Sequence, residues 1–172
     1  SGAAASICST HTAMFLTSIL ALTDFSSDSE RALARAGQIA REHGAALRLM
    51  YMPFGKHPHC LDADTRLSQT AIAMEQRLEL TVRTVGAGNH SLDNVLLQAE
   101  HARLLVLPRR SERGILDSWF VGPDAIRFAR DCRCPVLVVH GAKRRRLRQI
   151  VVGIDFTSAS HHRAMLACLL DR

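Results

Sequence analysis

The chain has 172 residues, the length of about one domain, and 47% of them are apolar, which supports a real core and excludes wholesale disorder. The apolar run 13–22 is too short to span a membrane, and it lacks the basic flank and cleavage site of a secretory signal. Much of the formal charge of +6 lies in the basic segment 143–148, without the interleaved aromatic residues of a single-strand-binding surface. We therefore expect neither a membrane nor a nucleic acid as partner.

The first element predicted is a buried strand over Ser18–Thr23, followed by a helix that begins near Ser27. The unbroken apolar run 19–22 suits a strand that is covered on both faces. Ser27 and Glu30 have the spacing of a capping box. Asp24 thus follows a strand and precedes a helix N-terminus, where open α/β sheets bind ligands. It could instead only cap turn amides, and both roles remain open.

The rest of the chain alternates strands with helices. Further strands are expected over residues 46–52, 80–85, 104–107 and Val136–Val139, and apolar residues at helical spacing predict helices around 67–78, 92–99 and from Pro123 onward. His43-Gly44 is the expected stop of the first helix. This alternation predicts a parallel sheet with right-handed crossovers, in a three-layer α/β domain.

The beginning of the domain recurs near the end of the chain. Residues 149–170 resemble residues 18–39, and Asp155 to Ser158 repeats the pattern of Asp24 to Ser27. We interpret this as the start of a second, truncated copy of the domain. The expected organisation is a leader or vector remnant at 1–13, a domain at 14–140, a basic linker at 141–148 and the second copy at 149–172.

Five cysteines are an odd number without framework spacing, so we expect a reduced, cytoplasmic protein. Cys132 and Cys134 form a CxC pair, which we interpret as core thiols beside a buried strand rather than as a metal or redox motif. His57, His59 and Cys60 supply zinc-type ligands within four residues. An exposed variable loop is the favoured interpretation there, so zinc is not expected.

Several segments in order resemble the universal stress protein family: the strand and Asp-containing loop at residues 19–26, the fourth strand at 104–107, the loop at 109–122 and the closing strand at 134–139. The resemblance implies a nucleotide-binding, Rossmann-like fold with five parallel strands in the order 3-2-1-4-5. It also implies that Asp24 and Pro108 face each other at the switch point of the sheet.

In family members that bind ATP, the Asp contacts the adenosine and a Gly-x2-Gly-x9-Gly-Ser/Thr loop binds the phosphates. This chain has Pro108 at the first Gly, Ser111 at the second, Gly122 one residue late and Pro123 at the Ser/Thr. Arg109, Arg110 and Arg113 could bind phosphate in place of the lost amides, although arginines in an exposed loop are usually only solvated, and both interpretations stay open. The candidate nucleotide-binding residues are Leu22, Thr23, Asp24, Met52, Leu107, Pro108, Arg109, Arg110, Ser111, Gly114, Gly122 and Pro123.

The chain has no nucleophile elbow, Walker loop or HExxH pair, so we expect no enzyme, although slow ATP hydrolysis stays open. The favoured function is a stress-response binding protein with a degenerate nucleotide loop, acting through dimerisation and an unidentified protein partner. Its dimer or strand-swapped assembly would use Val136, Leu137, Val138 and Val139. The alternative is a switch protein that binds ATP or another adenine nucleotide.

Overall fold

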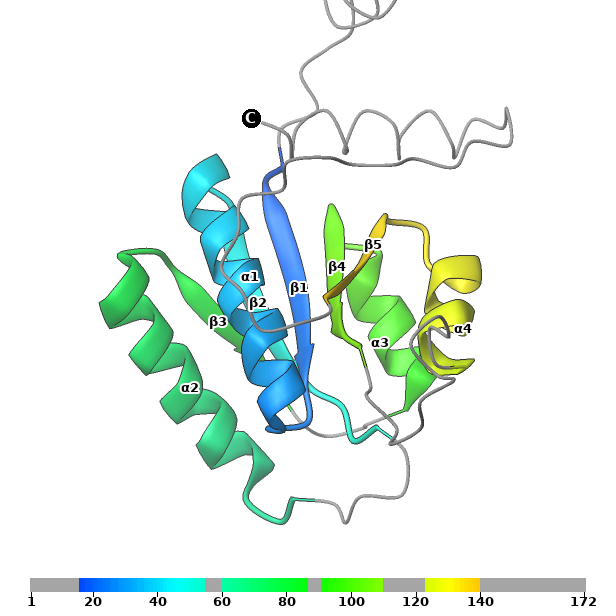
Figure 1. The fold of residues 1–172 in the computed structure, drawn as a ribbon, viewed down its shortest axis with the longest axis horizontal. Helices are drawn as coiled ribbons and strands as arrows, with labels where there is room; N and C mark the ends of the chain where they lie inside the picture. The colour runs from blue at the N-terminus through cyan, green and yellow to red at the C-terminus, as the bar shows by residue number, and fades with distance from the viewer. Residues whose placement is uncertain (1–15, 55–59, 87–90, 110–122, 140–172) are drawn as a thin grey trace, which may run out of the picture.

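The computed structural model describes residues 16–54, 60–86, 91–109 and 123–139. In these ranges strands and helices alternate along the chain (Figure 1). The elements are β1 (Ser18–Thr23), α1 (Ser27–His43), β2 (Ala46–Tyr51), α2 (Ala63–Leu78), β3 (Val82–Val85), α3 (Leu92–Ala99), β4 (Leu104–Pro108), α4 (Pro123–Asp131) and β5 (Val136–Val139).

The strands form one parallel sheet in the order β3-β2-β1-β4-β5, which confirms the predicted topology. β1 is the central strand, where Ile19 lies opposite Leu47 of β2 on one side and Leu104 of β4 on the other. Residues 19–22 have no exposed surface. Their unbroken apolar run is therefore explained by helices covering both faces of the sheet.

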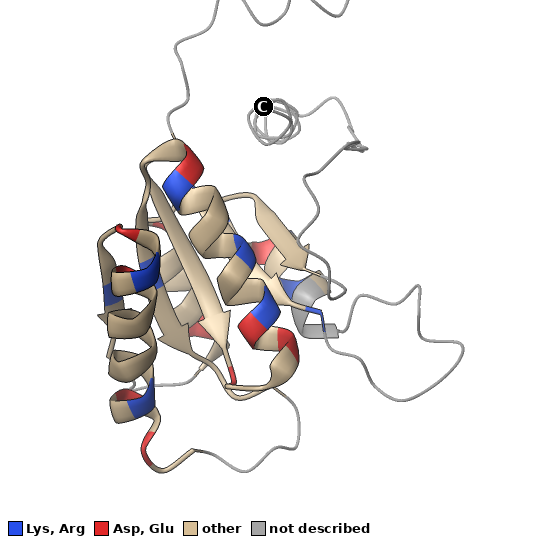
Figure 2. Cartoon of the chain, turned by 60° about the vertical axis from the view of Figure 1, so that its left-hand side comes forward, with Lys and Arg blue, Asp and Glu red and all other residues tan. Residues whose placement is uncertain are grey.

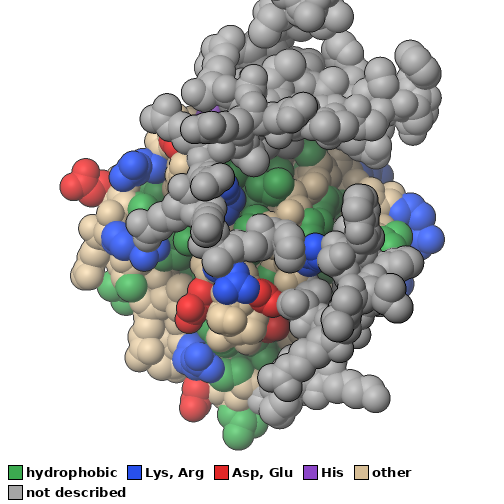
Figure 3. Space-filling view, in the orientation of Figure 1, with side chains coloured by type: hydrophobic (Ala, Val, Ile, Leu, Met, Phe, Trp, Pro, Cys, Tyr) green, Lys and Arg blue, Asp and Glu red, His purple; other side chains and the backbone are tan. Residues whose placement is uncertain are grey.

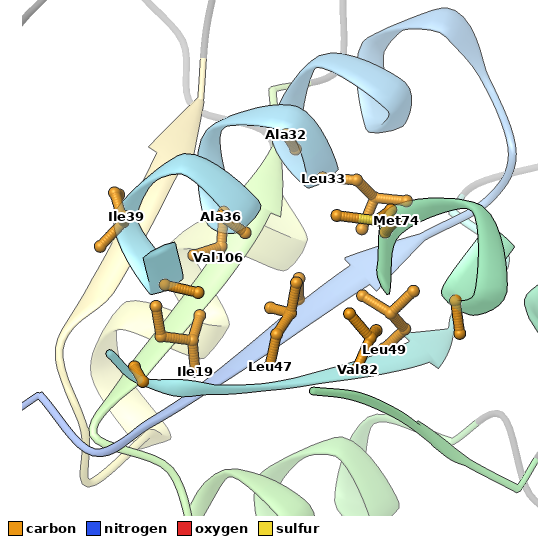
Figure 4. Packing of buried hydrophobic residues seen from close by; sticks show 14 of the residues in the cluster. Ile19, Ala32, Leu33, Ala36, Ile39, Leu47, Leu49, Met74, Val82 and Val106 are labelled. Carbon is orange, nitrogen blue, oxygen red and sulfur yellow. The ribbon is translucent and has the colours of Figure 1, made fainter. Parts of the chain in front are cut away.

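Alternating side chains of each strand pack into two separate hydrophobic cores, one on each face of the sheet. Ile19 and Ala21 of β1 pack under α1 and α2, whereas Leu20 and Leu22 pack under α3 and α4. Figure 4 shows the first core, in which side chains of α1 point down onto β1, β2 and β4. Such burial stabilises a domain by about 25 cal/mol for each Å² of apolar surface removed from water.

The N-cap of α1 is Ser26, so the predicted cap at Ser27 was wrong by one residue. Ser26 has extended backbone angles, and its Oγ accepts a 3.3 Å hydrogen bond from the amide of Ser29. Ser27 is already helical and exposed. A cap needs a non-helical backbone, which the capping-box spacing alone does not determine.

The helix ends as predicted at Gly44, which has a left-handed φ of 63°. The Gly44 amide donates to the last carbonyls of the helix, at Ala40 and Arg41. Where α1 and α2 cross, Gly37 lets the helices approach closely, because a Cβ there would lie 2.5 Å from Leu78 Cδ1. The two helices thus lie side by side over the same face of the sheet (Figure 1).

Three boundaries differ slightly from the sequence prediction. β2 ends at Tyr51 rather than Met52, and β4 includes Pro108 as its last residue. β3 begins at Val82 rather than at residue 80, because Glu79 has a left-handed φ of 54° and Glu75 accepts the Val82 amide at 2.8 Å. The predicted leader, basic linker and second copy lie outside the described residues. Among the helices described, none combines the length and apolarity needed to cross a membrane.

Candidate functional site

The candidate site lies where β1 and β4 end. These strands are neighbours, but the helix after β1 packs on one face of the sheet and the helix after β4 packs on the other. The chain therefore leaves the two strands in opposite directions, which defines the topological switch point. Ligands of open α/β sheets bind outside the carboxyl ends of the strands at this point. Asp24 and Pro108 occupy these two ends, as the sequence predicted.

The loop after β1 is fixed by a set of short hydrogen bonds around Asp24. Its Oδ1 accepts from the Ser26 amide at 3.0 Å and from the Ser29 hydroxyl at 2.6 Å. The Thr23 hydroxyl oxygen accepts from the Phe25 amide at 3.0 Å. The carboxylate thus performs the capping role considered for it, and the loop holds it in one orientation.

Burial raises the pKa of the Asp24 carboxyl, but hydrogen bonds from Ser26 and Ser29 oppose it and prevail. The net pKa lies below its ordinary value. Asp24 is consequently ionised at neutral pH, half-buried beside the N-terminus of α1, whose dipole favours a negative charge. This arrangement attracts cationic or hydrogen-bond-donating groups, such as the hydroxyls of a sugar.

Phe25, the next residue of the loop, has a left-handed φ of 62°, which is unusual for an aromatic residue. Its ring stacks on buried Tyr51 at the end of β2, with the ring centroids 5.2 Å apart and the planes 16° apart. The Arg66 guanidinium of α2 lies 4.4 Å from the centre of the Phe25 ring. These contacts from two other elements offset the cost of the backbone conformation.

The aromatic stack extends to the segment before α2. The Tyr51 hydroxyl accepts a 2.9 Å hydrogen bond from the Cys60 amide, and Cys60 Sγ lies 3.8 Å from an Arg66 guanidinium nitrogen. This cluster was not predicted from the sequence, because its members belong to three separate segments of the chain and share no motif. The left-handed Phe25 is visible only in the folded backbone.

The end of β4 lacks one backbone donor. The amides of Leu105 and Arg109 donate to the Pro135 and Val139 carbonyls, at 3.0 and 2.8 Å. Because amides alternate along a strand, that of position 108 would face β1 and the switch point. Pro108 has no N–H, so this donor is missing. Proline in place of the family's glycine therefore removes a backbone donor on the side of β4 where a ligand would lie.

The other predicted residues are partly in place. Leu22, Thr23 and Leu107 are buried, and half-buried Met52 donates its amide to the Thr23 carbonyl at 2.9 Å. Arg109 is half-buried, and Pro123 is the first residue of α4. Arg110, Ser111, Arg113, Gly114 and Gly122 lie outside the described residues.

Of the metal ligands considered in the sequence, His57 and His59 also lie outside the described residues. Cys60 is half-exposed beside Arg66. In the described part of the chain, no three His, Cys, Asp or Glu side chains are grouped as metal ligands would be.

Basic and acidic residues are interspersed along α1 and α2 (Figure 2). On the face seen in Figure 3, Lys and Arg are interspersed with Asp and Glu rather than gathered. Several form pairs along a helix, such as Arg31 with Asp28. The described residues visible on this face therefore do not form the single-sign patch typical of a nucleic-acid-binding surface.

Residues 16–140 match the family model described as "Universal stress protein family". A search of curated proteins gave no match.

Among solved structures, a universal stress protein in complex with cAMP is similar, with 22% identity, a TM-score of 0.57 and coverage of 74% of this chain and 98% of that one. A universal stress protein from Archaeoglobus fulgidus in complex with dAMP has 18% identity and a TM-score of 0.50, covering 73% and 98% of the respective chains. A universal stress protein from Archaeoglobus fulgidus DSM 4304 has 13% identity and a TM-score of 0.64, covering 89% of this chain and 62% of its own. At these identities the likeness concerns the fold.

Proposed function

Because the chain belongs to the universal stress protein family, we propose that it is a regulatory binding protein of the stress response that acts without catalysis. The observation that carries this proposal is Pro108 at the end of β4. It removes the backbone donor that would face the switch point, where a phosphate chain would need hydrogen bonds. Asp24 in turn uses its Oδ1 to hold the first turn of α1.

On this proposal the protein acts through surfaces rather than through chemistry. β5 is one of the two edge strands of the described sheet, and its four residues are apolar and half-buried. An apolar edge strand favours pairing with another chain, because its outer backbone groups need partners. A homodimer or strand-swapped assembly through Val136–Val139, together with a protein partner, is the proposed mode of action.

A second candidate is an adenine nucleotide bound at the switch point. It is supported by the similar structures that hold cAMP and dAMP, each of which carries one phosphate. A single phosphate needs fewer hydrogen-bond donors from the loop than the triphosphate of ATP. The missing amide at Pro108 would therefore weaken its binding less. The ionised Asp24 would accept hydrogen bonds from the sugar.

Calorimetric titration of ATP, with and without magnesium, and of AMP and cAMP into the full chain separates the two candidates. We expect no binding of ATP tighter than about 100 µM, which corresponds to roughly −5.5 kcal/mol. Binding of AMP or cAMP that Asp24→Asn abolishes would favour the second candidate. Tight ATP binding by the unaltered chain would contradict the role given to Pro108.

Two variants at Pro108 sharpen the test. Pro108→Ala restores the amide, and Pro108→Gly restores both the amide and the freedom of the backbone. If the missing donor is what prevents binding, affinity for ATP should rise in both. Sedimentation of the full chain at several concentrations tests the proposed assembly, and a monomer at all of them would rule out pairing through β5.

A further inference from the structure

The turn between α4 and β5 brings two thiols into contact. Cys132 Sγ and Cys134 Sγ are 3.4 Å apart, and both side chains are half-buried at the margin of the second core. The expectation of thiols packed in the core was thus only partly met. Both cysteines are partly exposed to solvent, and their sulfurs are within hydrogen-bonding distance of each other.

The backbone on each side of the pair is anchored. The Cys132 amide donates to the Phe128 carbonyl of α4 at 2.9 Å, and the Pro135 carbonyl accepts the Leu105 amide of β4 at 3.0 Å. Phe128 itself is buried. The turn therefore presents the two sulfurs to each other as part of the fold.

The two thiols differ in acidity. A hydrogen bond from Cys134 lowers the pKa of Cys132 to about 7, while the same contact together with burial raises the pKa of Cys134. One sulfur is thus a thiolate in part at neutral pH, and the other holds a proton. Charged groups nearby include Arg48 of β2, whose pKa is lowered by burial and only partly restored by Cys134, and Arg133, which is 4.0 Å from Glu100. Asp131, next to Cys132 in the chain, forms ion pairs with Arg130 at 2.8 Å and Arg127 at 3.8 Å.

We propose that Cys132 and Cys134 form a redox-active dithiol that closes reversibly into an intrachain disulfide by exchange with a low-molecular-weight disulfide such as oxidised glutathione. The proposal stands on the sulfur contact and on the accessibility of both side chains. It is independent of what binds at the switch point.

The exchange proceeds in two balanced steps. The Cys132 thiolate attacks one sulfur of the small disulfide, forming a mixed disulfide and releasing one small thiolate. Cys134 then loses its proton to solvent and attacks Cys132 Sγ, which closes the intrachain bond and releases the second small thiolate. The protein loses two electrons, the small disulfide gains them, and reduced thiols reverse both steps.

The disulfide between Cys132 and Cys134 should be readily reduced. Its loop contains one residue, Arg133, between the bonded cysteines. Stabilisation of a disulfide by chain entropy grows with loop length, so a loop this short contributes little. Such bonds are typical of labile, regulatory disulfides rather than of permanent cross-links.

The experiment equilibrates the full chain in glutathione buffers of graded potential, quenches it in acid and alkylates the free thiols. Trypsin cleaves after Arg133, so the two cysteines fall on different peptides that remain joined only if the disulfide has formed. We expect the amount of joined peptide to increase with buffer potential in a single two-electron transition. It should disappear when reduced thiol is added. If both cysteines are still free to be alkylated in the most oxidising buffer, no disulfide has formed and the proposal is wrong.

Variants assign the roles of the two sulfurs. Cys134→Ser should accumulate a stable mixed disulfide with glutathione at Cys132, whereas Cys132→Ser should accumulate far less at Cys134. Cys60→Ser is the matched control, because Cys60 is also half-exposed but lies in another part of the domain. In Cys60→Ser, the disulfide should form at the same buffer potential as in the unaltered chain. Equal labelling of the remaining cysteine in both single variants would contradict the assignment of Cys132 as the attacking thiol.

A further pair of variants tests the contact itself. Cys134→Ala removes the hydrogen bond to Cys132, whereas Cys134→Ser keeps a donor at the same position. Alkylation of Cys132 at pH 7 should be several-fold slower in the alanine variant than in the serine variant. Equal rates in two variants with unchanged melting temperatures would show that the contact does not activate Cys132.

Discussion

The buried hydroxyl of Ser29 donates a 2.6 Å hydrogen bond to Oδ1 of Asp24, so the first turn of α1 holds the carboxylate that follows β1. The same hydroxyl lies 2.9 Å from the Ser26 carbonyl oxygen and 3.1 Å from the Ser26 hydroxyl. One buried polar atom therefore joins the strand end, the cap and the helix.

Ser29→Ala should destabilise the domain by about 1–2 kcal/mol, because it leaves a half-buried carboxylate without one of its donors. Urea unfolding of the variant and the unaltered chain measures the difference. Ser27→Ala is the matched control, since Ser27 is exposed in the same turn. Equal losses in both variants would mean that the hydroxyl of Ser29 has no special role.

Asp24 should make stability depend on acid pH. Its pKa is lower in the folded chain than in the unfolded one, so its stabilising effect is present above its ordinary value of about 3.8. The effect is lost as the pH falls through the lower, folded value. As the pH is lowered from 6 to 2, the melting temperature should therefore fall more steeply for the unaltered chain than for Asp24→Asn. Parallel curves would contradict this assignment.

Gly44→Ala should cost about 1 kcal/mol, because the left-handed backbone at the end of α1 is unfavourable for a residue with a Cβ. No atom lies within 4 Å of the added Cβ, so the loss would be purely conformational. Gly86→Ala is the control, because that site is equally open and has no left-handed φ. Thermal unfolding of both variants measures the difference, and an equal effect at the two sites would refute the explanation.

Phe25→Gly should leave the domain more stable than Phe25→Ala by about 1 kcal/mol, although glycine is usually the worse choice. Both variants lose the stack on Tyr51 and the contact with Arg66, and only alanine keeps the left-handed strain. Chemical denaturation of the two variants isolates that strain. A more stable alanine variant would indicate that the loop changes conformation once the ring is removed.

The sequence predicted those features that depend on local patterns. The apolar run of β1, the proline at the start of α4 and the glycine after α1 each have a physical effect within a few residues, and all three lie where expected. The cap at Ser26 was missed because it depends on the backbone angles of one residue.

The remaining features required the tertiary structure. The stack of Phe25 on Tyr51 joins the ends of two strands that become neighbours only in the sheet. Likewise, the CxC spacing of Cys132 and Cys134 does not reveal whether the sulfurs point together or into the core. Their contact depends on how the turn after α4 enters β5.

The position of β1 also determines the order in which parts of the domain open. β1 is hydrogen-bonded on both sides and fully covered, so its amides exchange with solvent only when the whole sheet comes apart. β5 pairs with β4 and is only half-buried in the described domain, so its amides exchange through a local opening of lower free energy. The thiol pair adjoins β5, so we expect its oxidation to change the free energy of this local opening.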